Sequence, residues 1–228
     1  MTAAGERGDV TALTAPVEDY LKAIYEIERE GRAAATTDIA HRLSIAPASV
    51  SGMVRRLADQ GLIAHERYHG VRLTESGRRA ALRTLRRHRI IEAYLAGALG
   101  YPWDEVHAEA ERLEHAASDA LVDRMAAAIG EPTVDPHGAP IPTREGAIDE
   151  RPRRSLAELA PGERARVTRV ADEDPERLRY LATLAIVPGA TVTVLERAPF
   201  DGPITLELGG MRRHIGRALA AVVLVEPV

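Results

Sequence analysis

The sequence predicts a mostly α-helical chain that ends in a small β domain. Up to about residue 129, apolar residues recur three and four positions apart, which is the spacing of amphipathic helices. Beyond Pro152 apolar and polar residues alternate, as they do in half-buried strands. A segment rich in Pro and Gly separates the two regions. With 228 residues, the chain has room for two or three compact units.

The N-terminal part of the chain predicts two short helices. Residues 1–15 are expected to be disordered, and apolar residues at helical spacing predict a first helix over 16–30 that begins with a Pro. Thr36 or Thr37 can cap a second helix that ends near Ser44, because a hydroxyl accepts hydrogen bonds from the first free amides.

A third helix and a hairpin follow. The helix is expected from Pro47 to Gln60, and residues 62–74 predict two strands that turn at His69 and Gly70. Three helices with a tight turn between the last two, followed by a hairpin, form a winged helix-turn-helix. We therefore expect this fold over residues 16–74.

The remaining chain divides into a helical region, a linker and the β domain. We expect helices at 75–99, 103–117 and 118–129. The Pro- and Gly-rich segment 130–152 has no periodicity and is interpreted as a linker. We expect the helical domain over 75–140, with the start of this segment included, the linker proper over 141–152 and the β domain over 153–228. A β-barrel-like domain is expected from strands at 164–170, 190–198, 203–209 and 221–227, with a short helix at 175–184.

Charge and composition narrow the functional classes. The net charge is −4, yet residues 49–89 carry ten Arg against three acids, while residues 102–131 carry eight acids against two Arg. A basic segment beside an acidic one predicts an anion-binding surface and a cation-binding surface. The chain has no Cys, which excludes disulfides and thiolate metal sites. Without a secretory signal or a long apolar run, we expect a cytoplasmic protein with no membrane partner.

The winged helix predicts contacts to double-stranded DNA. The third helix would enter the major groove with short side chains that allow close approach, and arginines would contact phosphates. The start of the second helix would direct backbone amides toward a phosphate. The predicted DNA-binding residues are Thr36, Thr37, Ala48, Ser49, Ser51, Gly52, Arg55, Arg56, Arg67 and Arg72.

The acidic segment predicts a metal site. His107, Glu111, Glu114 and His115 fall on one helical stripe about 100° wide, where like charges would repel without a cation. His88 and Glu92 lie four residues apart on the preceding helix, and Asp19 lies in the first turn of the first helix. Oxygen and imidazole ligands suit Mn²⁺, Fe²⁺, Co²⁺ or Zn²⁺, and the lack of thiolates favours harder ions such as Mn²⁺.

Two other interpretations stay open. Each residue taken singly is more often structural than ligating, and Glu111 and Glu114, which flank Arg112, could form helix-surface salt bridges. The joint occurrence of the two motifs is what favours a metal site. A metallohydrolase also uses carboxylates and histidines to activate water. The sequence offers no candidate nucleophile and no Gly-rich phosphate loop, so we expect that the protein is not an enzyme.

Several motifs of the chain resemble those of a known protein family. VEDYLKAIYEIE, RRHRIIEAYL, WDEVHAEAERLEHAASD and DPHGAPIP resemble the diphtheria-toxin-repressor family of metal-dependent regulators over the whole chain. The resemblance implies a winged helix-turn-helix, a helical dimerisation and metal-binding domain, and a C-terminal SH3-like (FeoA-like) β-barrel. It also implies a homodimer that binds a palindromic operator.

The resemblance implies two metal sites. The primary activating site would consist of Asp19, Glu111, Glu114 and His115. The ancillary site would consist of His88, Glu92 and His107, joined by a carboxylate of the third domain. That carboxylate could come from Asp172, Glu173, Asp174 or Glu176, and ungapped counting back from Gly189 favours Asp174.

Two positions indicate a branch of the family. Iron-responsive members carry Met and Cys where this chain has Asp19 and Glu111, so the chain is similar to manganese regulators. Lys22 stands where compact two-domain manganese regulators have a second metal-binding Glu, which implies two separate sites in a three-domain protein. The resemblance thus implies a Mn²⁺-activated repressor of metal-uptake genes, with Co²⁺ or Zn²⁺ as substitutes in vitro. An Fe²⁺-responsive repressor of the same fold is the alternative.

Overall fold

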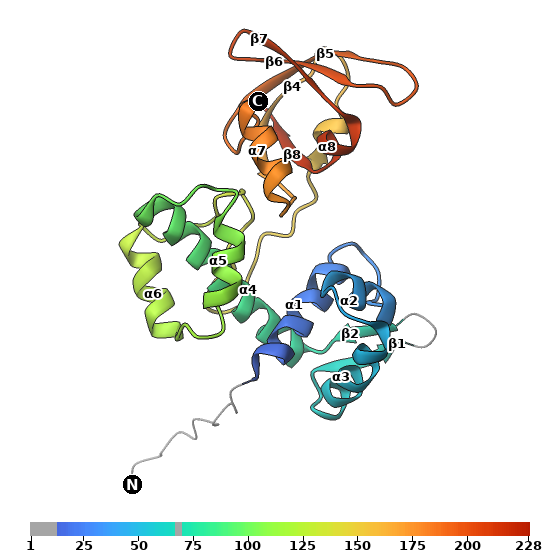
Figure 1. The fold of residues 1–228 in the computed structure, drawn as a ribbon, viewed down its shortest axis with the longest axis vertical. Helices are drawn as coiled ribbons and strands as arrows, with labels where there is room; N and C mark the ends of the chain where they lie inside the picture. Colours follow the sequence, from blue (N-terminus) through green and yellow to red (C-terminus); the bar gives the residue numbers. More distant parts are fainter. Residues whose placement is uncertain (1–12, 67–69) are drawn as a thin grey trace. The chain divides into compact units, whose positions relative to one another are not determined.

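The structure is a computed structural model that describes residues 13–66 and 70–228. The chain forms two compact units, residues 1–84 and 85–228, and the division falls within the long helix α4 (Glu75–Leu99) (Figure 1). Most of the segment expected to be disordered, 1–15, lies outside the described residues. Among the helices that the structure describes, none has the length and apolar character needed to cross a membrane.

The first unit is a winged helix-turn-helix, as the sequence predicted. Its elements are α1 (Ala15–Glu28), α2 (Thr36–Arg42), α3 (Pro47–Asp59), β1 (Ile63–Glu66), β2 (Gly70–Leu73) and the start of α4 (Figure 1). The apolar faces of the three helices supply its buried core, which includes Leu21, Ile24, Ile39, Val50 and Leu57. The expected helix boundaries hold to within two residues.

The start of α2 differs from the prediction that Thr36 or Thr37 caps it. Ala35 is the N-cap residue and makes no side-chain cap hydrogen bond. The backbone of Ala34 exchanges two hydrogen bonds with Val71 of β2, so the chain leaves the sheet directly before the helix begins. This backbone pairing, rather than a capping hydroxyl, sets the start of α2.

Gly77, in the first turn of α4, is packed against backbone. A Cβ added there would lie 1.9 Å from the carbonyl oxygen of Leu62, whereas a Cβ at Gly97 of the same helix would have its nearest contact at 3.9 Å. We expect Gly77→Ala to lower the free energy of unfolding by about 1–3 kcal/mol through overpacking. Gly97→Ala, the matched control, should raise it by up to about 1 kcal/mol. Urea unfolding measures both, and equal stability of the two variants would contradict the packing.

The second unit begins with a helical region. It contains the rest of α4, α5 (Val106–Leu113) and α6 (Asp119–Ala128), which pack through a cluster that includes Ile90, Ile91 and Val122. The helix predicted over 103–117 is shorter in the structure, where α5 spans Val106–Leu113. Ser118 caps α6, because its side chain accepts a hydrogen bond from the amide of Leu121.

A carboxylate is buried at the end of this short helix. Leu113 is 38% exposed, whereas Glu114 has no exposed surface. Glu114 follows the last residue of α5 and keeps a right-handed helical conformation. The chain thus buries a carboxylate and exposes the apolar side chain beside it, which marks Glu114 for the site described below.

The first half of the segment interpreted as a linker, 130–152, is instead a buried turn. Asp135 Oδ1 accepts hydrogen bonds from the amides of His137 and Ala139, at 2.8 and 2.9 Å. The carbonyls of Pro140 and Pro142 accept from Arg89 and Arg86 of α4. Backbone groups held by helix side chains need no periodic sequence, which is why this order was not predicted.

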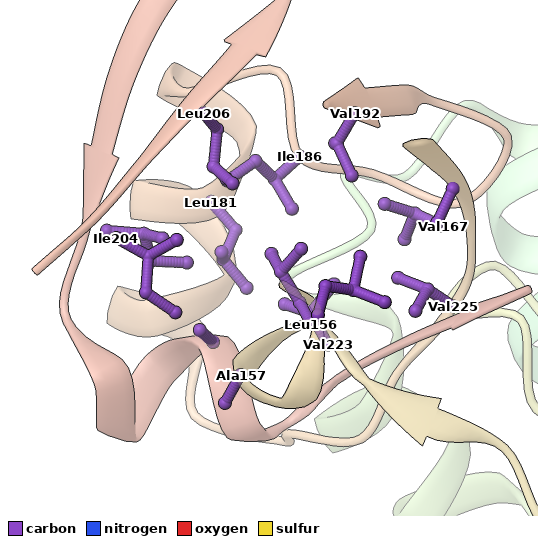
Figure 2. Packing of buried hydrophobic residues seen from close by; sticks show 14 of the residues in the cluster. Leu156, Ala157, Val167, Leu181, Ile186, Val192, Ile204, Leu206, Val223 and Val225 are labelled. Atoms are coloured by element: carbon purple, nitrogen blue, oxygen red, sulfur yellow. The ribbon is translucent and has the colours of Figure 1, made fainter. Parts of the chain in front are cut away.

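The β domain consists of strands, two short helices and a 3₁₀ turn. Its elements are β3 (Arg154–Ser155), the 3₁₀ turn η1 (Leu156–Glu158), β4 (Arg164–Val170), α7 (Pro175–Thr183), β5 (Thr191–Arg197), β6 (Ile204–Leu208), β7 (Met211–Ile215), α8 (Arg217–Ala221) and β8 (Val223–Pro227). The strands form a six-stranded antiparallel sheet with the order β3-β8-β4-β5-β6-β7. Buried side chains from strands and helices converge on one apolar core, with Leu156, Val167, Leu181, Val192 and Val223 among them (Figure 2).

Candidate metal centre

Helices α4 and α5 bring three predicted ligands together. His88 and Glu92 lie one turn apart on α4, and the distance from His88 Nε2 to Glu92 Oε1 is 3.0 Å. His107 of α5 completes the group, with Nδ1 at 3.2 Å from the same Glu92 oxygen and 3.1 Å from His88 Nε2. His88 and Glu92 are buried, so α4 holds them rigidly. This is the trio that the family resemblance assigns to the ancillary site.

His88 also contacts the residues assigned to the primary site. Its Nδ1 lies 2.6 Å from Glu114 Oε2 and 3.6 Å from Glu111 Oε1. His115 Nε2 lies 3.4 Å from the other oxygen of Glu114. His88 therefore stands between the two predicted sets of ligands and touches both.

Burial and neighbouring groups shift the pKa values of Glu92 and His107 in opposite directions. Burial alone would favour the neutral form of Glu92, but His88 and the hydrogen bonds from both histidines lower the pKa of Glu92. Burial would lower the pKa of His107, but the hydrogen bond to Glu92 and the charge of Glu173 raise it. Because a metal binds only the unprotonated imidazole, a cation at this site must displace these protons, and its affinity should rise with pH.

The third-domain carboxylate nearest to this group belongs to Glu173. Its Oε2 lies 3.6 Å from His107 Nε2. Asp174, which residue counting favoured, instead caps α7, where its Oδ1 accepts from the amides of Glu176 and Arg177. An Asp followed directly by Pro175 is a typical helix start, and this signal in the sequence reserves Asp174 for capping.

Asp19 belongs to the other unit. It is half-buried on α1, between Val17 and Tyr20, both of which lie in the core of the winged helix. The link between Asp19 and the ligands of α5 stays a prediction.

The residues in the second unit have the chemistry of a divalent-cation site. Imidazole nitrogens and carboxylate oxygens from α4, from α5 and the residues directly after it, and from the loop with Glu173 lie close together in a mostly buried cluster. Mn²⁺, Fe²⁺, Co²⁺ and Zn²⁺ all accept such mixed ligands. These side chains therefore fit the metal that the sequence predicted.

The predicted DNA-contacting residues of α3 share one exposed face. Ser51, Gly52 and Arg55 are exposed, whereas Val50 and Val54 on the other face are buried. Ala48, Ser49 and Arg56 are exposed as well, and Thr36 and Thr37 form the first turn of α2.

Of the two predicted DNA-binding arginines of the wing, Arg72 lies among the described residues. Arg72 is on β2 and forms an ion pair of 2.6 Å with Glu66 on β1, so a phosphate would have to compete with this carboxylate. Arg67 lies outside the described residues.

Two buried residues near the cluster were missed as candidate ligands. Asp135 and His137 come from the turn after α6 and lie close to Glu92. Their DPHG motif was part of the resemblance, but no ligand spacing pointed to them, because a turn has no fixed period.

Comparison with known proteins identifies the family. Residues 12–71 match the iron-dependent repressor N-terminal DNA-binding domain, 74–143 match the iron-dependent repressor metal-binding and dimerisation domain, and 154–227 match the FeoA domain. The iron-dependent repressor IdeR of Mycobacterium tuberculosis (strain ATCC 25618 / H37Rv) is 34% identical over 223 residues, covering 92% of this chain and 96% of IdeR.

Solved structures show the same similarity. A manganese-dependent transcriptional repressor in complex with manganese is 39% identical with a TM-score of 0.86, covering 93% of this chain and 100% of that one. ScaR with bound Zn²⁺ is 30% identical with a TM-score of 0.79, covering 93% and 99%. The family consists of transcriptional repressors and not enzymes, which excludes the metallohydrolase alternative. The chain belongs to the diphtheria-toxin-repressor (iron-dependent repressor) family, and it is a metal-dependent, DNA-binding transcriptional repressor with a dimerisation domain.

Proposed function

We propose that this repressor responds to Mn²⁺ and controls metal-uptake genes. The observation that carries the proposal is the ligand set, which offers oxygen and imidazole donors but no sulfur at Asp19 and Glu111, where the family's iron-responsive members carry Met and Cys. Harder oxygen donors favour Mn²⁺ over softer competitors. The solved manganese-dependent repressor, at 39% identity, supports the same branch.

We propose two sites with different roles. In the primary site, Asp19, Glu111, Glu114 and His115 would hold the activating cation. In the ancillary site, His88, Glu92, His107 and Glu173 would hold a second one, and Glu173 replaces Asp174 because of its distance to His107. The bound cation supplies positive charge that lets buried carboxylates stay ionised without protons.

The residues around Asp19 explain how a restraint on its carboxylate would reach the DNA-reading helix. Tyr20 and Leu21 directly follow Asp19 and are buried in the core of the winged helix. On the same helix, Glu28 Oε1 accepts from the amide of Leu73 in the wing, at 2.8 Å. A fixed Asp19 therefore orients α1, and α1 is joined to both the core and the wing.

In a dimer, fixing both winged helices would favour a palindromic operator whose half-sites match their spacing. Thermodynamic linkage then requires that DNA tighten metal binding by the same factor as metal tightens DNA binding. The primary site would thus act as a switch, and the repressor would sense the metal whose uptake it limits.

A titration of DNA affinity against two metals tests the proposal. The probe is a duplex enriched from a random-sequence pool in the presence of Mn²⁺, and the titration with Mn²⁺ or Fe²⁺ is carried out without oxygen. We expect Mn²⁺ to activate binding at lower free concentrations than Fe²⁺. Equal or greater potency of Fe²⁺ would assign the chain to the iron-responsive branch, as the IdeR relative would favour. DNA binding that is unchanged by chelation would contradict the switch itself.

A further inference from the structure

The edge of β2 that faces away from β1 is held by two different kinds of group. Val71 exchanges two backbone hydrogen bonds with Ala34, at 2.9 and 3.0 Å. Because the peptide groups of alternate residues face the same edge of an antiparallel strand, the amide of Leu73 points to the same side. There it donates to the carboxylate of Glu28, with Oε1 at 2.8 Å. A side chain of α1 thus continues the pairing that the backbone of Ala34 begins.

Arg72 lies between these two anchored residues of β2. On the other edge of the strand it is the register partner of Ala64 in β1, so β2 is held from both sides at this point. The side chain of Arg72 is 45% exposed, and so is much of its ion-pair partner Glu66. Exposed ion pairs contribute little, so a phosphate can replace this carboxylate. The guanidinium is therefore available to DNA, while the backbone that carries it is fixed.

The position of Glu28 is unfavourable for a carboxylate by itself. Glu28 is the last residue of α1, where the helix dipole places partial negative charge. Burial raises the pKa of Glu28, although the hydrogen bond from Leu73 and the charges of Arg72 and Arg78 act in the opposite direction. Arg78 of α4 lies over the ring of Tyr25 on α1, with its guanidinium carbon 5.1 Å from the ring centroid. The partners of Glu28 on β2 and α4, rather than the stability of α1, explain why an acid stands there.

The wing, which consists of β1 and β2, is too short to hold its own direction. Each strand has four residues, and an isolated two-stranded hairpin is at best marginally stable in water. At the base of the hairpin, the amide of Thr74 donates to the carbonyl of Leu62, and its hydroxyl donates to the carbonyl of Gly61. These bonds close the base, whereas the bond to Glu28 ties the wing to α1 and so fixes its direction relative to the helices.

We propose that Glu28 is a positioning residue for DNA binding, which holds β2 against α1 so that Arg72 meets the phosphate backbone. Without this bond the wing would sample more orientations, and Arg72 would contact DNA for a smaller fraction of the time. The inference rests on DNA binding by the winged helix and does not depend on which metal the protein senses. Glu28 follows Asp19 by nine residues, about 14 Å along α1, so it is no part of the proposed primary site.

Two substitutions of Glu28 separate its hydrogen bond from its charge. Glu28→Ala removes the acceptor, so the affinity of the Mn²⁺-loaded protein for the selected duplex should fall by about 5–10-fold, and the slope of log affinity against log salt should decrease by about one. Glu28→Gln keeps an oxygen that can accept from the amide of Leu73, and its affinity should stay within about twofold of that of the unchanged protein. Both variants should retain the full Mn²⁺ content after dialysis.

Glu26→Ala is the matched control, because Glu26 is also half-buried on α1 but pairs with Arg42 of α2, at 2.6 Å. It should leave the salt slope unchanged even where it lowers stability. Combining Glu28→Ala with Arg72→Ala tests the route, and the double variant should bind DNA no more weakly than Arg72→Ala alone. An unchanged affinity and slope in Glu28→Ala, or losses that add in the double variant, would overturn this inference. Loss of the Mn²⁺ response in the unchanged protein would instead overturn the proposed function.

Discussion

Replacing Asp19 with Asn should remove most of the stimulation of DNA binding by Mn²⁺. The amide has the same shape as the carboxylate but lacks the negative charge that a hard cation requires. We expect Mn²⁺ affinity to fall by about 100-fold or more, since even outer-shell partners of metal ligands contribute 10–100-fold. Gel-shift titrations of the selected duplex, with and without Mn²⁺, measure how much Mn²⁺ raises the DNA affinity. In the unchanged protein this increase should be about 5–150-fold, as is typical of allosteric ligands, and in Asp19→Asn most of it should be lost.

Glu18→Gln is the matched control for this experiment. It removes the same charge from the neighbouring position of α1, where Glu18 is also half-buried. The control should respond to Mn²⁺ like the unchanged protein. Should Asp19→Asn respond equally well, Asp19 is no ligand, and the primary site would have to be assigned again.

The second large effect is expected at the exposed face of α3. Arg55→Ala should weaken binding of the Mn²⁺-loaded protein to the selected duplex by about 10-fold, or about 1.4 kcal/mol, because the arginine is expected to contact phosphate or a base edge. If the contact is to phosphate, the slope of log affinity against log salt should decrease by about one.

Arg164→Ala provides the comparison for charge. Arg164 is exposed on β4 of the FeoA domain, and its replacement changes the net charge equally. The affinity of this variant should stay within about twofold of that of the unchanged protein. A similar loss in both variants would indicate a general charge effect and would contradict a specific role for α3.

The sequence predicted those elements whose residues have a regular period. α1, α3 and α4 were expected nearly at their observed bounds, because their apolar residues repeat at helical spacing and end at Pro or Gly. β7 was missed because it consists largely of basic residues and its alternation is weak. The two glycines before it, Gly209 and Gly210, both with positive φ, are the hairpin signal that could have revealed it.

The predicted metal ligands follow the same rule. His88, Glu92 and His107 lie on helices, so their spacing indicated which side chains share a face, and the structure brings them together. Glu173 and the turn with Asp135 and His137 depend on contacts between segments far apart in the chain. No local pattern encodes such contacts, and only the folded arrangement identifies these residues.

The central claim is that a cation joins α1 of the winged helix to the ligands at the end of α5. Anomalous diffraction at the manganese absorption edge, from crystals grown with Mn²⁺, tests it most directly. We predict an anomalous peak within bonding distance of the carboxylates of Asp19 and Glu114 and of the His115 imidazole. A manganese peak confined to other ligands, with the Asp19 carboxylate in solvent, would contradict the account.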